Sequence, residues 1–113
     1  MHELALAQSV IALVETTARR HAARCVTRVR LEIGALSHVS PAALQFCFDA
    51  AARGTLAERA RLDILATPGE GWCMPCGATV KIANRGEPCP ACGSYQLTVV
   101  RGDEMAVKDI DVS

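Results

Sequence analysis

The sequence predicts an α+β fold in which two helices pack on a small, mostly antiparallel sheet that carries an inserted four-cysteine zinc-ribbon module. Two segments repeat apolar residues every three or four positions, as amphipathic helices do. Other segments alternate apolar and polar residues, as half-buried strands do. Two Cys-x-x-Cys motifs follow one another closely near the C-terminal third. Half of the 113 residues are hydrophobic, which is enough for the core of one small domain or of a domain with a small module.

The two helices are expected over residues 3–20 and from residue 41 to about Gly54. The first has an apolar face at Leu4, Ala7, Ile11, Val14 and Ala18, which Leu6, Val10 and Leu13 widen. The second begins at Ser40-Pro41, an N-cap residue followed by proline at the first helical position. Its apolar residues are Ala43, Leu44, Cys47, Phe48 and Ala51.

Residues 25–33, 62–67 and 104–112 are expected to form the sheet. In the first strand one face should be formed by Cys25, Thr27, Val29, Leu31 and Ile33. Pro68-Gly69 should end the second strand and mark a boundary. The last strand has Met105 and Val107 on one face and Ile110 and Val112 on the other, and the pattern does not decide which face is buried.

The paired motifs between the last two strands predict a metal site. Cys73, Cys76, Cys89 and Cys92 have the spacing of a zinc ribbon, in which four thiolates bind structural Zn²⁺ tetrahedrally. Strands over residues 79–82 and 96–100 would extend the two cysteine turns. Disulfides or free thiols are an alternative, and iron bound as in a rubredoxin is another. Cys25 and Cys47 stand apart and are expected to be buried small hydrophobes.

Composition argues against several classes of function. The net charge is zero, so the chain lacks the basic footprint of a nucleic-acid-binding protein. It has no apolar run long enough for a transmembrane helix, and its start lacks the features of a signal peptide. We therefore expect a cytoplasmic protein without a membrane partner, in a reducing compartment where paired cysteines favour metal over disulfides.

The N-terminal Met1-His2-Glu3 is a second candidate metal site. The α-amine, the His2 backbone nitrogen and the His2 imidazole can bind one metal in successive chelate rings, and Glu3 can complete the set. Nitrogen-rich tetragonal donors suit Ni²⁺ or Cu²⁺. Taken alone the signal is weak, because a solvated, frayed terminus is the common alternative. His21 is expected to be a solvated charge at a helix end.

The whole chain resembles the HypA/HybF family of nickel metallochaperones, which act in maturation of nickel–iron hydrogenase. The resemblance rests on residues 1–4, Val29 to Ser37, Leu44 to Asp49, Arg53 to Thr55, the two cysteine motifs, and Gly102 to Met105. It implies a nickel-binding domain formed by residues 1–68 plus 101–113 and an inserted zinc-binding domain at residues 69–100. It assigns nickel, as transient cargo, to Met1, His2 and Glu3, and structural zinc to Cys73, Cys76, Cys89 and Cys92.

The resemblance also implies partners, namely a nickel-handling GTPase and the hydrogenase large subunit. It leaves open urease maturation proteins as further partners and a weak homodimer. Many relatives have an acidic residue where this chain has Ser40, a poor Ni²⁺ ligand that we interpret as an N-cap only. The neighbouring His38 is expected to be an ordinary surface residue of a loop.

Three functions from different classes follow. The first is a non-catalytic metal carrier that holds Ni²⁺ loosely beside a tight structural zinc. The second is a zinc ribbon that binds nucleic acid or another protein, although Lys81 and Arg85 are offset by Glu70 and Glu87. The third is a zinc enzyme, which four cysteines disfavour because catalytic zinc keeps an open position. We predict no catalytic residues and no organic cofactor, and favour the metal carrier.

Overall fold

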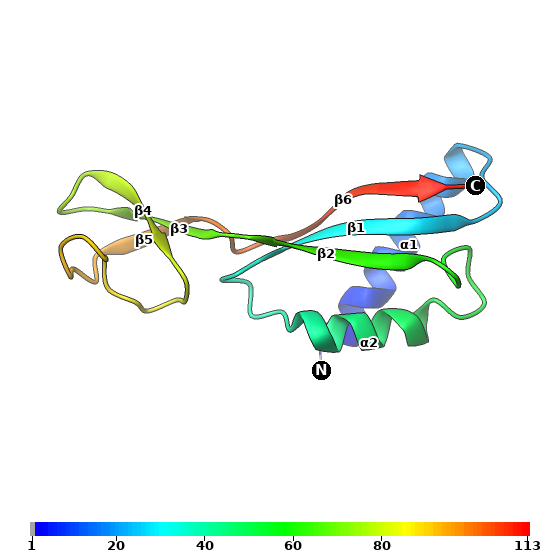
Figure 1. Ribbon diagram of the computed structural model, residues 1–113, viewed down its shortest axis with the longest axis horizontal. Coiled ribbons are helices and arrows are strands. Elements are labelled where there is room, and N and C mark those ends of the chain that lie inside the picture. Colours follow the sequence, from blue (N-terminus) through cyan, green and yellow to red (C-terminus); the bar gives the residue numbers. More distant parts are fainter. Residues whose placement is uncertain (1) are drawn as a thin grey trace. The chain divides into compact units, whose positions relative to one another are not determined.

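The computed structural model describes residues 2–113, and Met1 lies outside the described residues. The elements, in chain order, are α1 (His2–Arg20), β1 (Val26–Gly34), α2 (Pro41–Ala51), β2 (Arg61–Thr67), β3 (Gly69–Cys73), β4 (Ala78–Ile82), β5 (Leu97–Arg101) and β6 (Met105–Val112) (Figure 1). They form two three-stranded sheets, with strand orders β2-β1-β6 and β4-β3-β5. Two helices with small, mainly antiparallel sheets confirm the predicted fold class.

The chain divides into two compact units. The first unit extends to Leu31 and also contains Val39–Leu65 and Val107–Ser113. The second unit contains Glu32–His38 and Ala66–Ala106. Among residues 2–113, no helix is long and apolar enough to cross a membrane.

The core of the first unit comes from both helices and the sheet. The α1 residues Ala7, Ile11, Val14 and Ala18 are buried as predicted, and Val10 joins them. Leu44 and Phe48 are the buried residues of α2. Leu4 and Leu13, however, are 41% and 54% exposed, because a helical pattern defines a face but not how far neighbouring elements cover it.

The start of α2 follows from local chemistry. The Ser40 hydroxyl oxygen accepts a hydrogen bond from the backbone N–H of Ala43 at 3.3 Å, and Pro41 opens the helix. Ser40 is in an extended conformation, as N-cap residues are. The predicted N-cap is therefore present.

Two strands depart from strict alternation. In β1 the buried residues include Val26 and Val29, whereas Thr27 is exposed, so the prediction for Thr27 is wrong. In β6 both Val107 and Ile110 are half-buried and line a groove with α1. Each pair is three residues apart instead of two, so burial in these strands does not follow strict alternation.

Two expectations about single residues also need correction. Cys25 and Cys47 are half-buried instead of fully buried, because an apolar pattern does not fix how far neighbouring elements cover each residue. Both are free thiols.

In the second unit the sheet is antiparallel throughout. Strand β3 pairs with β4 from Gly69 opposite Ile82 to Cys73 opposite Ala78. It also pairs with β5, where a register shift lies between Glu70 and Gly71. Strands β4 and β5 lie near the positions that the sequence predicts, whereas β3 has no sequence prediction, because Gly69 and Gly71 weaken its strand pattern.

Candidate metal sites

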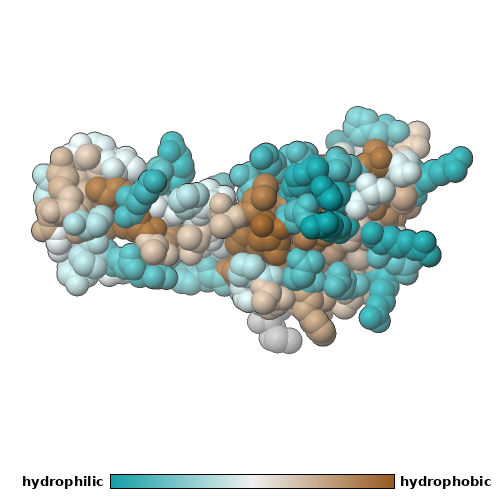
Figure 2. All heavy atoms as spheres, in the orientation of Figure 1, coloured by the Kyte–Doolittle hydropathy of each residue, from teal (hydrophilic) through white to brown (hydrophobic). Residues whose placement is uncertain are grey.

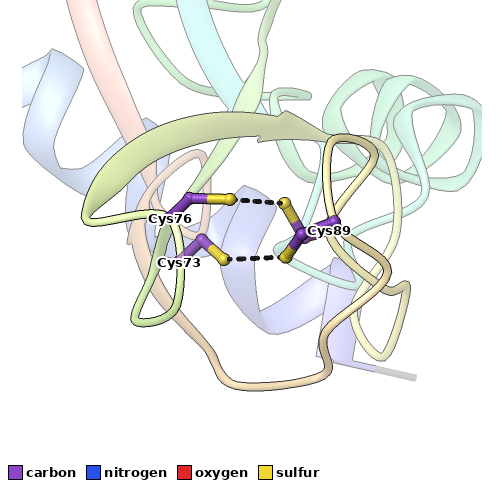
Figure 3. A group of neighbouring side chains, drawn as sticks. Cys73, Cys76 and Cys89 are labelled. Atoms are coloured by element: carbon purple, nitrogen blue, oxygen red, sulfur yellow. Dashed lines mark hydrogen bonds between the residues drawn. The ribbon is translucent and has the colours of Figure 1, made fainter.

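The four cysteines of the two motifs converge on one point. Their sulfur atoms all lie within 4.8 Å of one another. Cys73 Sγ is 3.6 Å from Cys92 Sγ, and Cys76 Sγ is 3.9 Å from Cys89 Sγ. Figure 3 shows the side chains of Cys73 and Cys76 pointing from one loop toward Cys89 in the other. The cluster therefore joins sulfurs from two separate turns.

The two turns have the same backbone structure. The N–H of Gly77 donates to the carbonyl of Cys73 at 2.9 Å, and the N–H of Gly93 donates to the carbonyl of Cys89 at 2.8 Å. Both glycines have positive φ, 61° and 78°, which explains glycine directly after each second cysteine. The repeated turn presents each pair of thiols to the same side.

Backbone N–H groups also point at the sulfurs. Donation from the N–H groups of Cys92 and then Ala91 lowers the pKa of the Cys89 thiol to about 7. The neighbouring thiols, with Cys92 first, raise the pKa of Cys76 to about 12. At Cys73 the N–H of Cys76 favours the thiolate, but burial and the thiols of Cys92 and Cys89 outweigh it and raise the pKa. Each thiolate disfavours ionisation of the thiols beside it. Four thiolates can therefore form together only where a cation binds them, because coordination deprotonates the thiols.

The spacing fits a tetrahedral metal. With Zn–S bonds of about 2.3 Å, tetrahedral sulfurs lie about 3.8 Å apart, close to the two separations above. A disulfide needs sulfurs about 2.05 Å apart, and all six cysteines are free, so the disulfide alternative is wrong. Iron prefers a similar shell of four cysteines, so geometry alone does not separate iron from zinc.

The N-terminal candidate lies at the start of α1. His2 Nε2 is 3.5 Å from Glu3 Oε2, and the His2 side chain is about half exposed while that of Glu3 is 14% exposed. Glu3 Oε2 also accepts the backbone N–H of Ser40 at 3.3 Å. This hydrogen bond, followed by one from the N–H of Glu3 itself, holds the pKa of the carboxyl below its usual range. The structure thus brings His2 and Glu3 together, whereas Met1 lies outside the described residues.

The contact between Glu3 and Ser40 was missed by sequence reasoning. Ser40 was interpreted as an N-cap only, yet its N–H also ties the start of α2 to a carboxylate of α1. The two residues are 37 positions apart. Every residue except proline has a backbone N–H, so no pattern of residue types could reveal the contact. His38 is exposed, with a positive φ of 62°, and His21 is exposed beyond the end of α1.

A ribbon in which four cysteines converge is the structure of a metal-binding protein. The family model described as "Hydrogenase/urease nickel incorporation, metallochaperone, hypA" matches residues 1–112. The chain belongs to this HypA family of nickel metallochaperones.

Similar proteins agree with the assignment. The chain is 54% identical over 112 residues to "Hydrogenase maturation factor HypA 2" of Bradyrhizobium diazoefficiens, with 99% of each chain covered. It is 52% identical to "Hydrogenase maturation factor HypA" of Rhodopseudomonas palustris, again over 99% of each. The solution structure of the nickel metallochaperone HypA from Helicobacter pylori matches with a TM-score of 0.72 and 28% identity, over 99% of this chain and 97% of that one.

Proposed function

We propose that this chain binds Ni²⁺ through the Met1 amine, His2 and Glu3 and delivers it during maturation of a nickel–iron hydrogenase. The observation that carries the proposal is the 3.5 Å separation of His2 Nε2 and Glu3 Oε2 at the first turn of α1. The first N–H groups of a helix have no intrahelical acceptor. Backbone nitrogens there can give up protons to a metal without breaking a helical hydrogen bond.

The same place suits release as well as binding. His2 is exposed, and part of the proposed ligand set is backbone at a chain end. A small movement of that end separates the ligands, whereas the proposed zinc site is closed by four sulfurs from two structured turns. Exchangeable cargo therefore fits the N-terminus, and a permanent ion fits the cysteines.

We further propose that Cys73, Cys76, Cys89 and Cys92 hold structural Zn²⁺ within a zinc-binding domain at residues 69–100. Residues 1–68 plus 101–113 would then form the nickel-binding domain. We also propose that the protein is cytoplasmic, non-catalytic and acts through partners; the family description, nickel incorporation by a metallochaperone, supports the role as a carrier. Those partners are a nickel-handling GTPase and the hydrogenase large subunit. The description also names urease, so urease maturation proteins are a second class of acceptor, and a weak homodimer is compatible with this function.

Nickel calorimetry at pH 7.5 and pH 6 tests the N-terminal site. The native chain should bind Ni²⁺ at the higher pH and lose affinity at pH 6, because protons compete for the amine (reference pKa about 7.7–8.0) and for imidazole (about 6.5). His2→Ala and an N-terminal extension should each abolish specific binding. His21→Ala, a matched exposed histidine at the other end of α1, should bind as the native chain does. Equal binding by all four proteins would exclude the N-terminal site.

Elemental analysis tests the cysteine site. Freshly purified protein should contain one zinc per chain, and Cys89→Ser should lose it and unfold the ribbon before the helical unit. Cys25→Ser, which replaces a free cysteine of the first unit, should keep full zinc content. Iron in place of zinc, or native protein without metal, would overturn the assignment.

A further inference from the structure

The β4-β3-β5 sheet has one closed face and one open face. On the closed face, β3 contributes the buried residues Gly71 and Cys73. Trp72, between them, points to the opposite face and is 43% exposed. It is the only tryptophan of the chain. A large aromatic side chain in the central strand is thus left partly exposed by its own unit.

The neighbours of Trp72 explain why it stays partly exposed. In the antiparallel register Trp72 lies opposite Thr79 on β4 and opposite Thr98 on β5. Both threonines are exposed and too short to cover an indole ring. Aromatic–threonine pairs stabilise a sheet. Such pairing does not by itself account for the exposure of the outer face of the ring. Exposed aromatic side chains surrounded by polar residues are typical of protein–protein contacts.

The next row on the same face carries an excess of positive charge. Glu70 lies opposite Lys81 on β4 and opposite Arg101 on β5. Arg101 Nη1 donates to Glu70 Oε1 at 2.8 Å. Within residues 2–113, no carboxylate is found within 4.0 Å of the Lys81 ammonium. One carboxylate therefore lies between two cations, and Lys81 is available to a partner.

We infer that this open face, defined by Glu70, Trp72, Thr79, Lys81, Thr98 and Arg101, docks an acidic, apolar segment of a partner protein. An apolar side chain would cover the indole while an adjacent carboxylate binds Lys81. Aromatic anchors such as Trp are enriched at interface centres, and charged groups such as the Lys81 ammonium belong to the polar rim around them.

Two other occupants fit less well. A second copy in a two-fold contact would set the same patch against itself, so the excess positive charges would face each other. A nucleic acid needs a basic surface, but the second unit has more carboxylates than cations. Its cations are Lys81, Arg85 and Arg101, and its carboxylates are Glu32, Glu70, Glu87, Asp103 and Glu104. A segment with one or two carboxylates beside apolar residues avoids the first repulsion and carries far less negative charge than a nucleic acid.

The test uses the full zinc-containing chain and three blocked peptides of equal length: alternating Glu and Leu, alternating Lys and Leu, and alternating Glu and Ser. Binding is followed by NMR chemical shifts and by emission of Trp72. The Glu/Leu peptide should shift backbone signals of β3, β4 and β5, move the emission to shorter wavelength and protect it from acrylamide. The Lys/Leu and Glu/Ser peptides should bind at least about tenfold more weakly, since each lacks one half of the contact. Equal affinity for all three would overturn the inference.

Variants separate binding from a purely structural role of the aromatic ring. Trp72→Thr should keep its zinc and lose at least about tenfold in affinity, as truncation of an interface anchor does. Tyr95→Thr, at an aromatic residue that is 74% exposed, should bind normally. If Trp72→Thr loses zinc, peptide affinity is compared for Lys81→Gln instead. That variant should weaken binding up to about fivefold at low salt, while Lys108→Gln in the first unit should not.

Sedimentation and a single-stranded oligothymidine complete the test. The chain without peptide should sediment as a species whose mass does not change with Trp72→Thr, and the oligonucleotide should not compete with the Glu/Leu peptide. A dimer that Trp72→Thr dissociates would assign the face to a second copy. Tighter binding of the oligonucleotide than of the peptide would assign it to nucleic acid. Either result would overturn the inference.

Discussion

Gly34→Ala should destabilise the second unit strongly, although Gly34 needs no positive φ. An ideal Cβ built on Gly34 would lie 2.1 Å from the carbonyl oxygen of Gly102 and 2.9 Å from the backbone nitrogen of Asp103. These neighbours are backbone atoms, so no flexible side chain can move aside. The end of β1 and the segment before β6 therefore have to separate for a methyl group to fit.

Separation would disturb two hydrogen bonds. The N–H of Gly34 donates to the carbonyl of Glu104, and the N–H of Leu36 donates to the carbonyl of Gly102, both at 2.8 Å. Each such bond contributes about 1 kcal/mol net. Forcing extra volume into a packed site costs about 1–3 kcal/mol more. Together we expect the free energy of unfolding to fall by about 3–5 kcal/mol, a large part of the roughly 5–15 kcal/mol that stabilises a typical domain.

Urea denaturation measures this loss separately in the two units. Emission of Trp72 reports on the second unit, and the helical far-UV circular dichroism signal reports on the first. The matched control is Gly86→Ala, where φ is +84° and nothing lies within 4 Å of an added Cβ. That change should cost only about 1–2 kcal/mol of left-handed backbone strain. The reasoning is refuted if Gly34→Ala costs no more than Gly86→Ala.

The other predictions concern the first unit. Phe48→Ala should lower the free energy of unfolding by about 3–5 kcal/mol, because Phe48 is 1% exposed. Phe46→Ala on the same helix, where Phe46 is 77% exposed, should change it by less than about 0.5 kcal/mol. Equal urea midpoints for the two variants would contradict the assigned core. Hydrogen bonding to Arg30 holds the pKa of Asp111 below its usual range. A lowered native pKa stabilises the fold above the ordinary value near 3.8, and that contribution is lost as pH falls through the native pKa. The stability difference between native protein and Asp111→Asn should therefore shrink from pH 6 to pH 3, and a pH-independent difference would show that the ion pair is not its cause.

Local chemistry is what the sequence determined by itself. Ser40-Pro41 specified the start of α2, because an N-cap and a proline act within one turn. The cysteine spacing with glycine after each second cysteine specified two equal turns, because each turn closes through its own backbone hydrogen bond. Periodicity likewise placed Val14 and Phe48 inside, since a repeat of three or four residues gathers one helix face.

Only the tertiary structure decided what depends on neighbours far along the chain. Leu13 and Leu4 belong to an apolar pattern but remain exposed, because burial requires another element above them. Strand β3 exists despite its glycines, because partners on both sides supply its hydrogen bonds. The contact of Glu3 with the N–H of Ser40 arises because the starts of α1 and α2 lie close together in space. The open face around Trp72 arises from the register of the strands that pair with β3. These are long-range geometric relations, which residue types at fixed spacing do not encode.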